Sequence, residues 1–435
     1  MSSAPAGATQ AANSPAGAAP IRRSPRFQTS RVLGRPTALL RHRAHLLRGR
    51  LLLSALSLLA SSCARQKVQP INAAPPPRLS VDEIAGAIPD GVSDRRSWAD
   101  AVITALDAIG VTPARQPVCA VLAIIEQESN FVANPTVPDL ARIVDAKLDE
   151  LGKKLGPVGR PAIDRLLAGK APGTSESFST RLRKVKTERD LDLVFRDLVA
   201  YYRAQFPTAA ATAEIASALF TGEDVDDLNP ITTAGSMQVS VRFAAARGQP
   251  RGLTRAQVRD ALYTRAGGVE CGTARLFAYQ ASYARFLYRF ADYNADVYAS
   301  RNAALQEQIS ILVGTALVSD GDILAYDRNG RALDVDTHSL AALLAFRVAY
   351  APELSERDVR HDAAKEKQLQ FESTDTYRAI KRVFQARQGV TPAYARVPEV
   401  TLKSPKLSRS RTTAWFAANV DKRFNQCMTR LPDRG

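Results

Sequence analysis

The chain has 435 residues, of which 45% are hydrophobic and 23% charged, and it contains 24 glycines and 25 prolines. This composition is typical of a globular protein with one large domain or two smaller ones, and it excludes an intrinsically disordered chain. The formal net charge is +16, from 59 basic and 43 acidic residues. No CxxC, HExxH, GxSxG, Walker or dinucleotide-binding glycine pattern occurs. The sequence therefore favours neither a metal nor a cofactor, and it does not support a serine or cysteine triad.

Residues 1–62 have the features of an export signal. They hold nine arginines and no lysine or acidic residue, and an apolar stretch at 51–59 is followed by small residues directly before Cys63. This order is typical of a secretory signal whose end resembles a bacterial lipobox, and the apolar stretch is too short for a stable membrane anchor. We expect Cys63 to be lipidated after cleavage; a cleaved signal without lipidation is the alternative.

The basic region is longer than a signal needs, so we expect the true start codon to lie downstream of Met1. By resemblance to lipoproteins, Ala64 after Cys63 fits outer-membrane sorting, which predicts an outer-membrane lipoprotein that faces the periplasm. Removing the nine arginines leaves 50 basic against 43 acidic residues, a balance of +7. This mild excess suits anionic polymers or lipid head groups, and no nucleic-acid motif accompanies it, so we expect no nucleic-acid partner.

The remaining sequence predicts a helical domain. Residues 63–79 form a Pro-rich tether, and Ser80 is the expected cap of a first helix. Hydrophobic periodicity predicts further helices at 98–109, 118–130, 138–155, 162–167, 188–204, 211–220, 253–263, 270–290, 339–348, 358–388 and 412–428. The exception is 323–333, where Asn329-Gly330 indicates a β-hairpin. We interpret Asp320, Asp322 and Asp327 beside it as turn residues.

The predicted helix at 118–130 is the most informative element. Its apolar run, between Pro117 and the break at Asn134-Pro135, predicts a core helix that ends near residue 131. Glu128 then lies in the last turn, where the helix dipole and the neighbouring apolar side chains should favour its protonated form. A protonated carboxyl group is what a general acid needs.

Three cysteines follow Cys63. In an oxidising compartment one pair of them can form a disulfide. Cys119 lies within an apolar helix and is interpreted as a buried thiol, so the expected pair is Cys271 with Cys427.

Three short segments together resemble the lysozyme-like lytic transglycosylases, which cleave bacterial peptidoglycan. The segments are Glu128-Ser129-Asn130-Phe131, similar to E-S-x-F; Gly235-Ser236-Met237-Gln238, similar to G-x-M-Q; and Ala291-Asp292-Tyr293-Asn294-Ala295, which matches A-x-Y-N-x. They occur in the order that the family has. A single match of this length is weak evidence, whereas three in the correct order in an exported helical protein are much stronger.

The resemblance implies a mainly α, lysozyme-like fold. Its core is expected at 80–134 and 230–300, with a helical insertion at 135–229 and a helical C-terminal extension at 301–435. The implied site consists of Glu128 as the only catalytic carboxylate and of the substrate contacts Ser129, Gly235, Met237, Gln238, Tyr293 and Asn294. In the family, the glutamate first protonates the glycosidic oxygen and then acts as a base while the sugar's own 6-hydroxyl attacks the anomeric carbon. The implied partner is the glycan strand of peptidoglycan, and the product is a 1,6-anhydro sugar.

Each of these residues also has a structural interpretation. Glu126 competes with Glu128 for the role of the acid, and only the E-S-x-F match selects between them. Met237 is of a type that fills cores, Asn294 of a type that caps helices, and Tyr293 belongs to an aromatic stripe. Asp292 is a candidate second carboxylate, which would make the protein a hydrolase.

The sequence departs from the family pattern at the insertion and at Asp296, where the family has glycine. An insertion beside the cleft could line a groove, bind a partner or block the site. The chain as a whole also resembles an uncharacterised bacterial lipoprotein family that includes YaiW, whose members are outer-membrane lipoproteins associated with peptide uptake. This resemblance implies an alternative function, a catalytically silent adaptor that binds a protein partner in the cell envelope.

Overall fold

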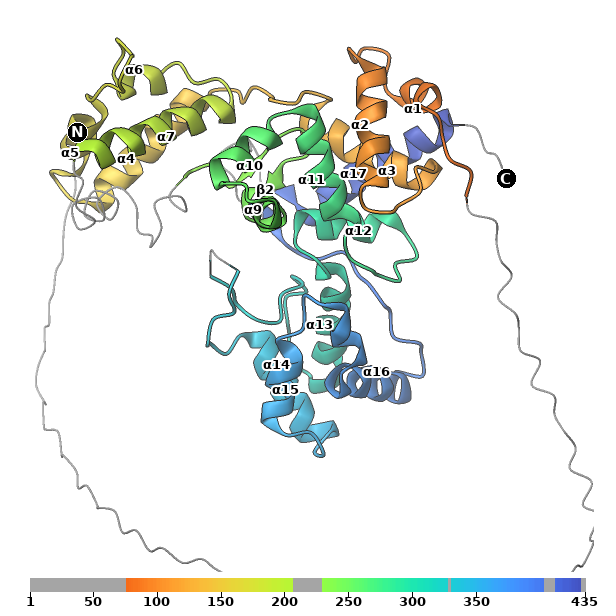
Figure 1. The fold of residues 1–435 in the computed structure, drawn as a ribbon. Coiled ribbons are helices and arrows are strands. Elements are labelled where there is room, and N and C mark those ends of the chain that lie inside the picture. Colours follow the sequence, from red (N-terminus) through yellow and green to blue (C-terminus); the bar gives the residue numbers. More distant parts are fainter. Residues whose placement is uncertain (1–75, 206–228, 328–329, 403–410, 432–435) are drawn as a thin grey trace, which may run out of the picture. The chain divides into compact units, whose positions relative to one another are not determined.

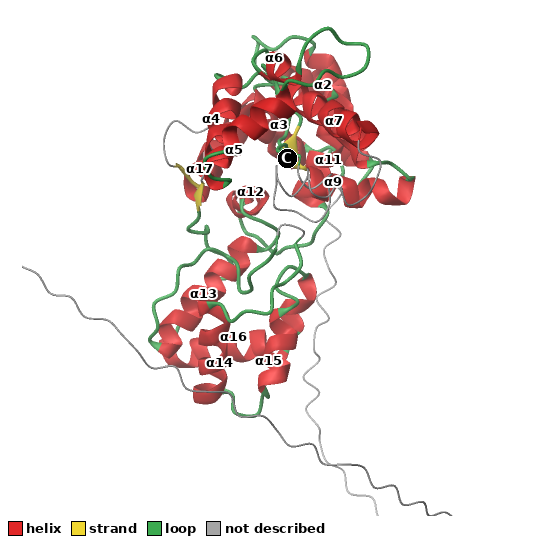
Figure 2. Ribbon diagram, turned by 90° about the vertical axis from the view of Figure 1, so that its left-hand side faces the viewer, coloured by secondary structure: helices red, strands yellow, loops and turns green. Residues whose placement is uncertain are grey.

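The computed structural model describes residues 76–205, 229–327, 330–402 and 411–431 (Figure 1). All of these residues belong to one compact unit, Asn72–Gly435. The predicted signal sequence, Cys63, most of the tether and the predicted helix at 211–220 lie outside the described residues. Figure 2 shows that the described part is mainly helical, with a few very short strands. Among the described residues, no helix combines the length and the apolar character that crossing a membrane requires.

The first three helices build the core around the predicted apolar segment. They are α1 (Val81–Ala87), α2 (Arg95–Asp107) and α3 (Arg115–Ser129). Ser80 caps α1 through a reciprocal pair of hydrogen bonds with Glu83, which confirms the predicted cap. All residues from 118 to 125 are buried, and α3 ends because Asn130 and Phe131 adopt positive φ angles of 50° and 61°. The predicted position of Glu128 in the last turn is therefore confirmed.

The segment predicted to be an insertion, 135–229, is helical where the structure describes it. Its helices are α4 (Leu140–Lys154), α5 (Gly159–Leu167), α6 (Phe178–Leu182) and α7 (Glu188–Gln205). The segments before α4 and before α7 are joined by an antiparallel bridge between Thr136 and Thr187. The Val137 N–H also donates to the Lys186 carbonyl, at 2.8 Å. As a result, α7 begins beside the segment that follows Glu128.

A short antiparallel sheet that the sequence did not predict follows the insertion. Strands β1 (Thr233–Ala234) and β2 (Val239–Ser240) pair with Thr233 opposite Ser240, and residues 235–238 connect them. We call this connection the 235–238 loop. The chain continues through α9 (Val241–Gly248), η2 (Gln249–Arg251), α10 (Arg255–Leu262), α11 (Arg265–Phe277) and α12 (Phe286–Asn294).

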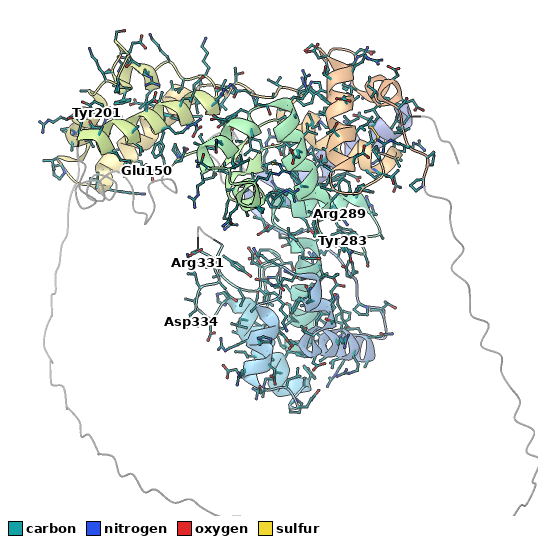
Figure 3. The ribbon with its side chains drawn as sticks, in the orientation of Figure 1. Glu150, Tyr201, Tyr283, Arg289, Arg331 and Asp334 are labelled. Atoms are coloured by element: carbon teal, nitrogen blue, oxygen red, sulfur yellow. A yellow bond between two sulfur atoms is a disulfide. The ribbon has the colours of Figure 1, made fainter. Side chains whose placement is uncertain are left out.

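The single helix predicted at 270–290 is wrong, because α11 ends at Phe277 and α12 begins at Phe286. Arg289 on α12 donates to the carbonyls of Leu276 and Tyr279 at 3.1 and 3.3 Å, so it satisfies acceptors at the end of α11. Figure 3 labels Arg289 and Tyr283 at this corner.

A second hydrophobic core lies among the helices that follow. They are α13 (Ala299–Val313), α14 (His338–Tyr350), α15 (Glu356–Ala363), η3 (Leu369–Ser373) and α16 (Asp375–Gln388). The single helix predicted at 358–388 is wrong. It breaks after Ala363, and Thr374 caps a new helix while Asp362 accepts a hydrogen bond from the Thr376 hydroxyl at 2.8 Å.

The hairpin predicted at 323–333 is confirmed in part and is shorter than predicted: the Asp327 N–H donates to the Arg331 carbonyl at 2.9 Å, and the Leu333 N–H donates to the Ala325 carbonyl at 2.8 Å. Among the described residues of this segment there is one isolated bridge, between Tyr326 and Ala332. The N–H groups of Ile323 and Leu324 donate instead to the buried carboxylate of Glu366, at 2.6 and 2.9 Å. A side chain therefore takes the donors that a partner strand would have used.

The last helix returns to the first core. Strands β3 (Thr401–Leu402) and β4 (Arg411–Thr412) pair, and α17 (Thr413–Arg430) then packs against α3 and α12. In Figure 1 the blue α17 lies beside the orange α3, which is distant in sequence. Within the segment 301–435, α17 thus shares a core with the first helices rather than with α13–α16.

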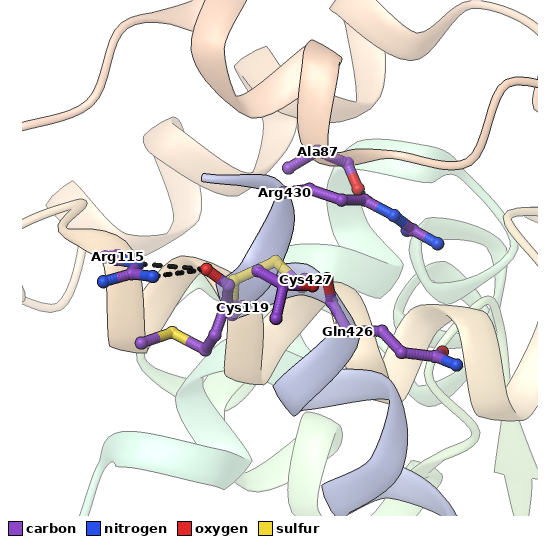
Figure 4. Close-up of a disulfide and its surroundings, with 8 residues drawn as sticks. Ala87, Arg115, Cys119, Gln426, Cys427 and Arg430 are labelled. Carbon is purple, nitrogen blue, oxygen red and sulfur yellow. Dashed lines mark hydrogen bonds between the residues drawn. A yellow bond between two sulfur atoms is a disulfide. The ribbon is translucent and has the colours of Figure 1, made fainter. Parts of the chain in front are cut away.

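The disulfide predicted between Cys271 and Cys427 is wrong. Cys427 on α17 is bonded to Cys119 on α3, with the two Cα atoms 5.4 Å apart, and Cys271 is a free thiol on α11 (Figure 4). The Arg115 guanidinium donates to the Met428 carbonyl at 2.5 Å, next to the disulfide. A cysteine in an apolar helix can be buried and still be bonded, because α17 covers that face of α3.

Candidate functional site

The two competing glutamates of α3 have different surroundings. Glu126 points toward α17, where its carboxylate lies 3.5 Å from the Arg423 guanidinium. Glu128 is partly exposed in the last turn. Ser129, a predicted substrate contact, is buried; its hydroxyl donates to the Ile125 carbonyl at 3.1 Å and accepts from the Val132 N–H at 3.3 Å. Ser129 therefore fixes the end of the helix that carries Glu128.

The 235–238 loop is a tight turn packed against α10 and α11. Gly235 has a φ of +82°, and a Cβ at this position would lie 2.1 Å from the Leu262 carbonyl oxygen, so only glycine fits. Met237 has no exposed surface, and its sulfur occupies the space left by Gly272, where a Cβ would lie 2.2 Å from Sδ. The Met237 side chain is thus part of the core, as its structural interpretation predicted.

Tyr293 connects the three motif segments. Its hydroxyl donates to the Met237 carbonyl at 2.8 Å, which joins α12 to the 235–238 loop. Burial raises the pKa of Tyr293, the Arg275 cation opposes this shift, and the negative charge of Glu128 raises the pKa further. The Glu128 carboxylate is therefore close enough to act electrostatically on the same phenol. The structure thus joins the loop to Tyr293 by a hydrogen bond, and the charge of Glu128 acts on the same phenol.

Asn294 and Asp292 bind groups of other elements. Asn294 Oδ1 accepts a hydrogen bond from the Thr413 hydroxyl at 2.9 Å, at the start of α17. Asp292 is 1% exposed, and burial raises its pKa. Its carboxylate accepts four hydrogen bonds, from the hydroxyls of Tyr279 and Tyr283 and from the N–H groups of Tyr298 and Ser300. Asp292 therefore organises the start of α13, and its hydrogen-bonding capacity is used by protein groups.

The Gln238 side chain is held by protein groups on both ends of its amide. Its oxygen accepts from the Thr233 hydroxyl at 3.0 Å, and its nitrogen donates to the Glu188 carboxylate at 3.0 Å. Glu188 is the first residue of α7 and is 3% exposed. Glu188 could not be predicted from the sequence, because its partner Gln238 lies 50 residues away and no motif includes Glu188.

Arg275 and Asp296 continue the site toward the second core. The Arg275 guanidinium lies 5.7 Å from the Tyr293 ring centre, donates to the Tyr293 carbonyl at 3.3 Å, and is 3.6 Å from Asp296. Asp296 also pairs with Lys367 at 2.7 Å. Burial alone would raise the pKa of Asp296, but the Lys367 cation holds this pKa below its ordinary value. Asp296 thus forms an ion pair with the segment before η3.

A surface cavity of about 850 Å³ lies between α1, α2, η2 and α11, and none of the predicted site residues lines it. Its charged lining consists of Arg96, Asp100, Arg251, Arg265 and Glu270. Arg251 and Glu270 pair at 2.8 Å, so part of this charge is neutralised. Among the described residues, no group of histidine, cysteine, aspartate and glutamate side chains could hold a metal ion.

Comparisons with known proteins show which family the chain is related to, and the names of these relatives state no activity. A family model described as "Protein of unknown function (DUF1615)" matches residues 91–430. The chain is 34% identical over 383 residues to the "Uncharacterized protein YaiW" of Escherichia coli (strain K12), which covers 86% of this chain and 98% of that protein. No solved structure matches the chain. The geometry of the site is therefore the main guide to its chemistry.

Proposed function

The chain belongs to the DUF1615 family of proteins of unknown function, and we propose that it cleaves the glycan strands of peptidoglycan as a lytic transglycosylase. The observation that carries the proposal is the meeting of three distant segments around Tyr293. Its hydroxyl binds the Met237 carbonyl at 2.8 Å, and the charge of Glu128 acts on the same group. Three independent accidental matches would have no reason to meet in space.

The proposed reaction uses Glu128 twice. Its carboxyl group first donates a proton to the glycosidic oxygen, and the bond between that oxygen and the anomeric carbon breaks. The resulting carboxylate then removes the proton from the 6-hydroxyl of the same sugar, whose oxygen bonds to the anomeric carbon. Glu128 is protonated again, and no water is consumed. One carboxylate suffices because the substrate supplies its own nucleophile, unlike the two-carboxylate glycosidases.

The position of Glu128 favours this role. The C-terminal end of α3 carries partial negative charge, which stabilises a protonated carboxyl group. The Tyr293 hydroxyl donates a hydrogen bond to the Met237 carbonyl, so its contribution is to fix the 235–238 loop. In this proposal, the acetamido group of a sugar binds to the backbone of the loop.

We also propose that the protein is exported and anchored in the outer membrane, facing the periplasm, by a lipid on Cys63. The signal-like sequence before Cys63 supports this, and the disulfide between Cys119 and Cys427 fits an oxidising compartment. The substitution Cys63→Ser should move the protein from the membrane fraction to the soluble fraction. If the protein stays membrane-bound after this substitution, the lipid anchor is refuted.

One observation favours a second candidate function, a catalytically silent lysozyme-fold protein that binds a partner in the cell envelope. The amide of Gln238, which the resemblance assigns to substrate, is occupied by Glu188 and Thr233. A groove that keeps its fold but has this contact closed would bind without turnover.

Incubation of the mature protein with purified sacculi separates the two functions. We expect the wild type to release 1,6-anhydro-muropeptides and Glu128→Gln to release them roughly a hundredfold or more slowly, because the proton donor is lost. The matched control is Glu126→Gln, whose residue pairs with Arg423 and should keep activity. Release of no fragments by the wild type, together with retention on sacculi or on an envelope protein, would favour the silent binder.

A further inference from the structure

We propose that Glu188 is a positioning residue, supplied by the insertion, that sets the conformation of the 235–238 loop through Gln238. The inference rests on the proposed function in one respect, that the loop binds the acetamido groups of a glycan strand. In this proposal, the insertion contributes to the substrate site and does not block it.

Both the nitrogen and the oxygen of the Gln238 side-chain amide form hydrogen bonds with protein groups. The nitrogen donates to Glu188 at 3.0 Å and lies 3.4 Å from the Gly235 carbonyl oxygen, while the oxygen accepts from Thr233 at 3.0 Å. Thr233 lies on β1 and Gly235 within the loop, so one side chain joins the strand, the loop and α7. Because Gln238 itself has a φ of 49°, its backbone needs such support to remain in this conformation.

Glu188 is held firmly at its own end. The Thr136–Thr187 bridge precedes it, and the Asn134 side chain donates to the Thr187 hydroxyl at 3.3 Å. The N–H groups of Lys186 and Thr187 donate to the Asp190 carboxylate at 3.0 and 2.9 Å. With 3% exposure, the Glu188 carboxylate depends on protein donors, so its bond to Gln238 is costly to lose.

A second contact from the same helix reaches the segment that precedes β1. Asp192, one turn after Glu188, has no exposed surface and accepts from the Asn229 side chain at 2.6 Å and from Arg196 at 2.7 Å. Asn229 in turn accepts from the Ile231 N–H at 2.9 Å, two residues before β1. Helix α7 therefore holds both the approach to the loop and its last residue.

The loop position matters to Glu128 through Tyr293. The Met237 carbonyl, in the centre of the loop, accepts the Tyr293 hydroxyl, and the Glu128 charge acts on that phenol. A loop released from Glu188 would therefore shift relative to the acid. Substrate binding should suffer more than the chemical step, because the acid itself is unchanged.

Hydrogen exchange measured by mass spectrometry on the full mature protein tests this proposal. We expect Glu188→Ala to speed exchange in residues 233–240 by roughly tenfold or more, since a hydrogen bond to a charged group is lost. Glu188→Gln keeps an acceptor oxygen and should restore most of the protection. The control Asp197→Asn removes an ion pair with Arg181 inside the insertion, at 2.6 Å, and should leave 233–240 unchanged.

Unchanged exchange in Glu188→Ala would overturn the proposal, and so would an equal increase in Asp197→Asn, which would indicate general loosening of the insertion. On a soluble glycan substrate, Glu188→Ala should raise KM by a larger factor than it lowers kcat, and the reverse split would count against positioning. Exchange does not depend on turnover. If the wild type cleaves no glycan but Glu188→Ala still speeds exchange in the loop, the enzymatic function is contradicted and the positioning role of Glu188 stands.

Discussion

Glu366 is a fully buried carboxylate in the second core, and burial raises its pKa from 4.5 to about 7, against the lowering effect of its hydrogen-bond donors. Because the folded state holds this proton more tightly than the unfolded state, the protonated form favours folding. Its contribution to stability is therefore fully present below pH 4.5 and is lost as the pH rises through about 7.

We expect the free energy of unfolding to fall by roughly 1 to 3 kcal/mol between about pH 5 and about pH 8 because of Glu366. Urea unfolding of the wild type and of Glu366→Gln across this range measures the effect, since the variant lacks the titrating group. Glu356→Gln, at an exposed position on α15, serves as the control. Parallel pH profiles for the wild type and Glu366→Gln would contradict the prediction.

At the residue scale, the sequence identified Glu128 through a motif, whereas periodicity could not separate it from Glu126. Residues 118–125 are buried all round the helix, so α3 has no polar face to point to one glutamate. What distinguishes Glu126 is Arg423 on α17, almost 300 residues later in the chain. The role of Glu188 was hidden for the same reason, because its partner Gln238 lies on another element.

At the scale of elements, the disulfide between α3 and α17 closes the first core. Its two cysteines are 308 residues apart in sequence, so the bond removes much of the freedom of the unfolded chain. We expect Cys427→Ser to lower the free energy of unfolding by about 3 kcal/mol, and Cys271→Ser to leave it nearly unchanged. Thermal unfolding with and without reductant measures both. If Cys271→Ser lowers the unfolding temperature of the oxidised protein but not of the reduced protein, Cys271 takes part in the disulfide and the Cys119–Cys427 pairing is contradicted.

Helix prediction succeeded where local signals decide the boundary and failed where distant side chains do. Ser80 with Glu83 begins α1 and the residues after Ser129 end α3, and both signals are local. The break between α11 and α12 depends on Arg289, which satisfies carbonyls of the preceding helix end. The predicted hairpin is shorter than expected, because Glu366 accepts from the N–H groups of Ile323 and Leu324 at its first end. No local pattern contains such contacts, because the donor and the acceptor meet only in the folded chain.

At the scale of the whole molecule, two hydrophobic cores are joined by charged contacts near the site. Asp296 follows the third motif directly and pairs with Lys367, and Arg275 lies between Asp296 and Tyr293. The mainly helical fold could be predicted from periodicity, but the division into two cores could not. It depends on the return of α17 to α3, which leaves no signal in the sequence of either helix.

In the proposed mechanism, one carboxylate on α3 cleaves glycan without using water. Mass spectrometry of the fragments released from sacculi, in water labelled with heavy oxygen, tests this most directly. We predict that the new ends are 1,6-anhydro sugars, lighter by one water than hydrolysis products, and that they carry no label. Fragments that contain the heavy oxygen would show hydrolysis and would contradict the single-acid mechanism.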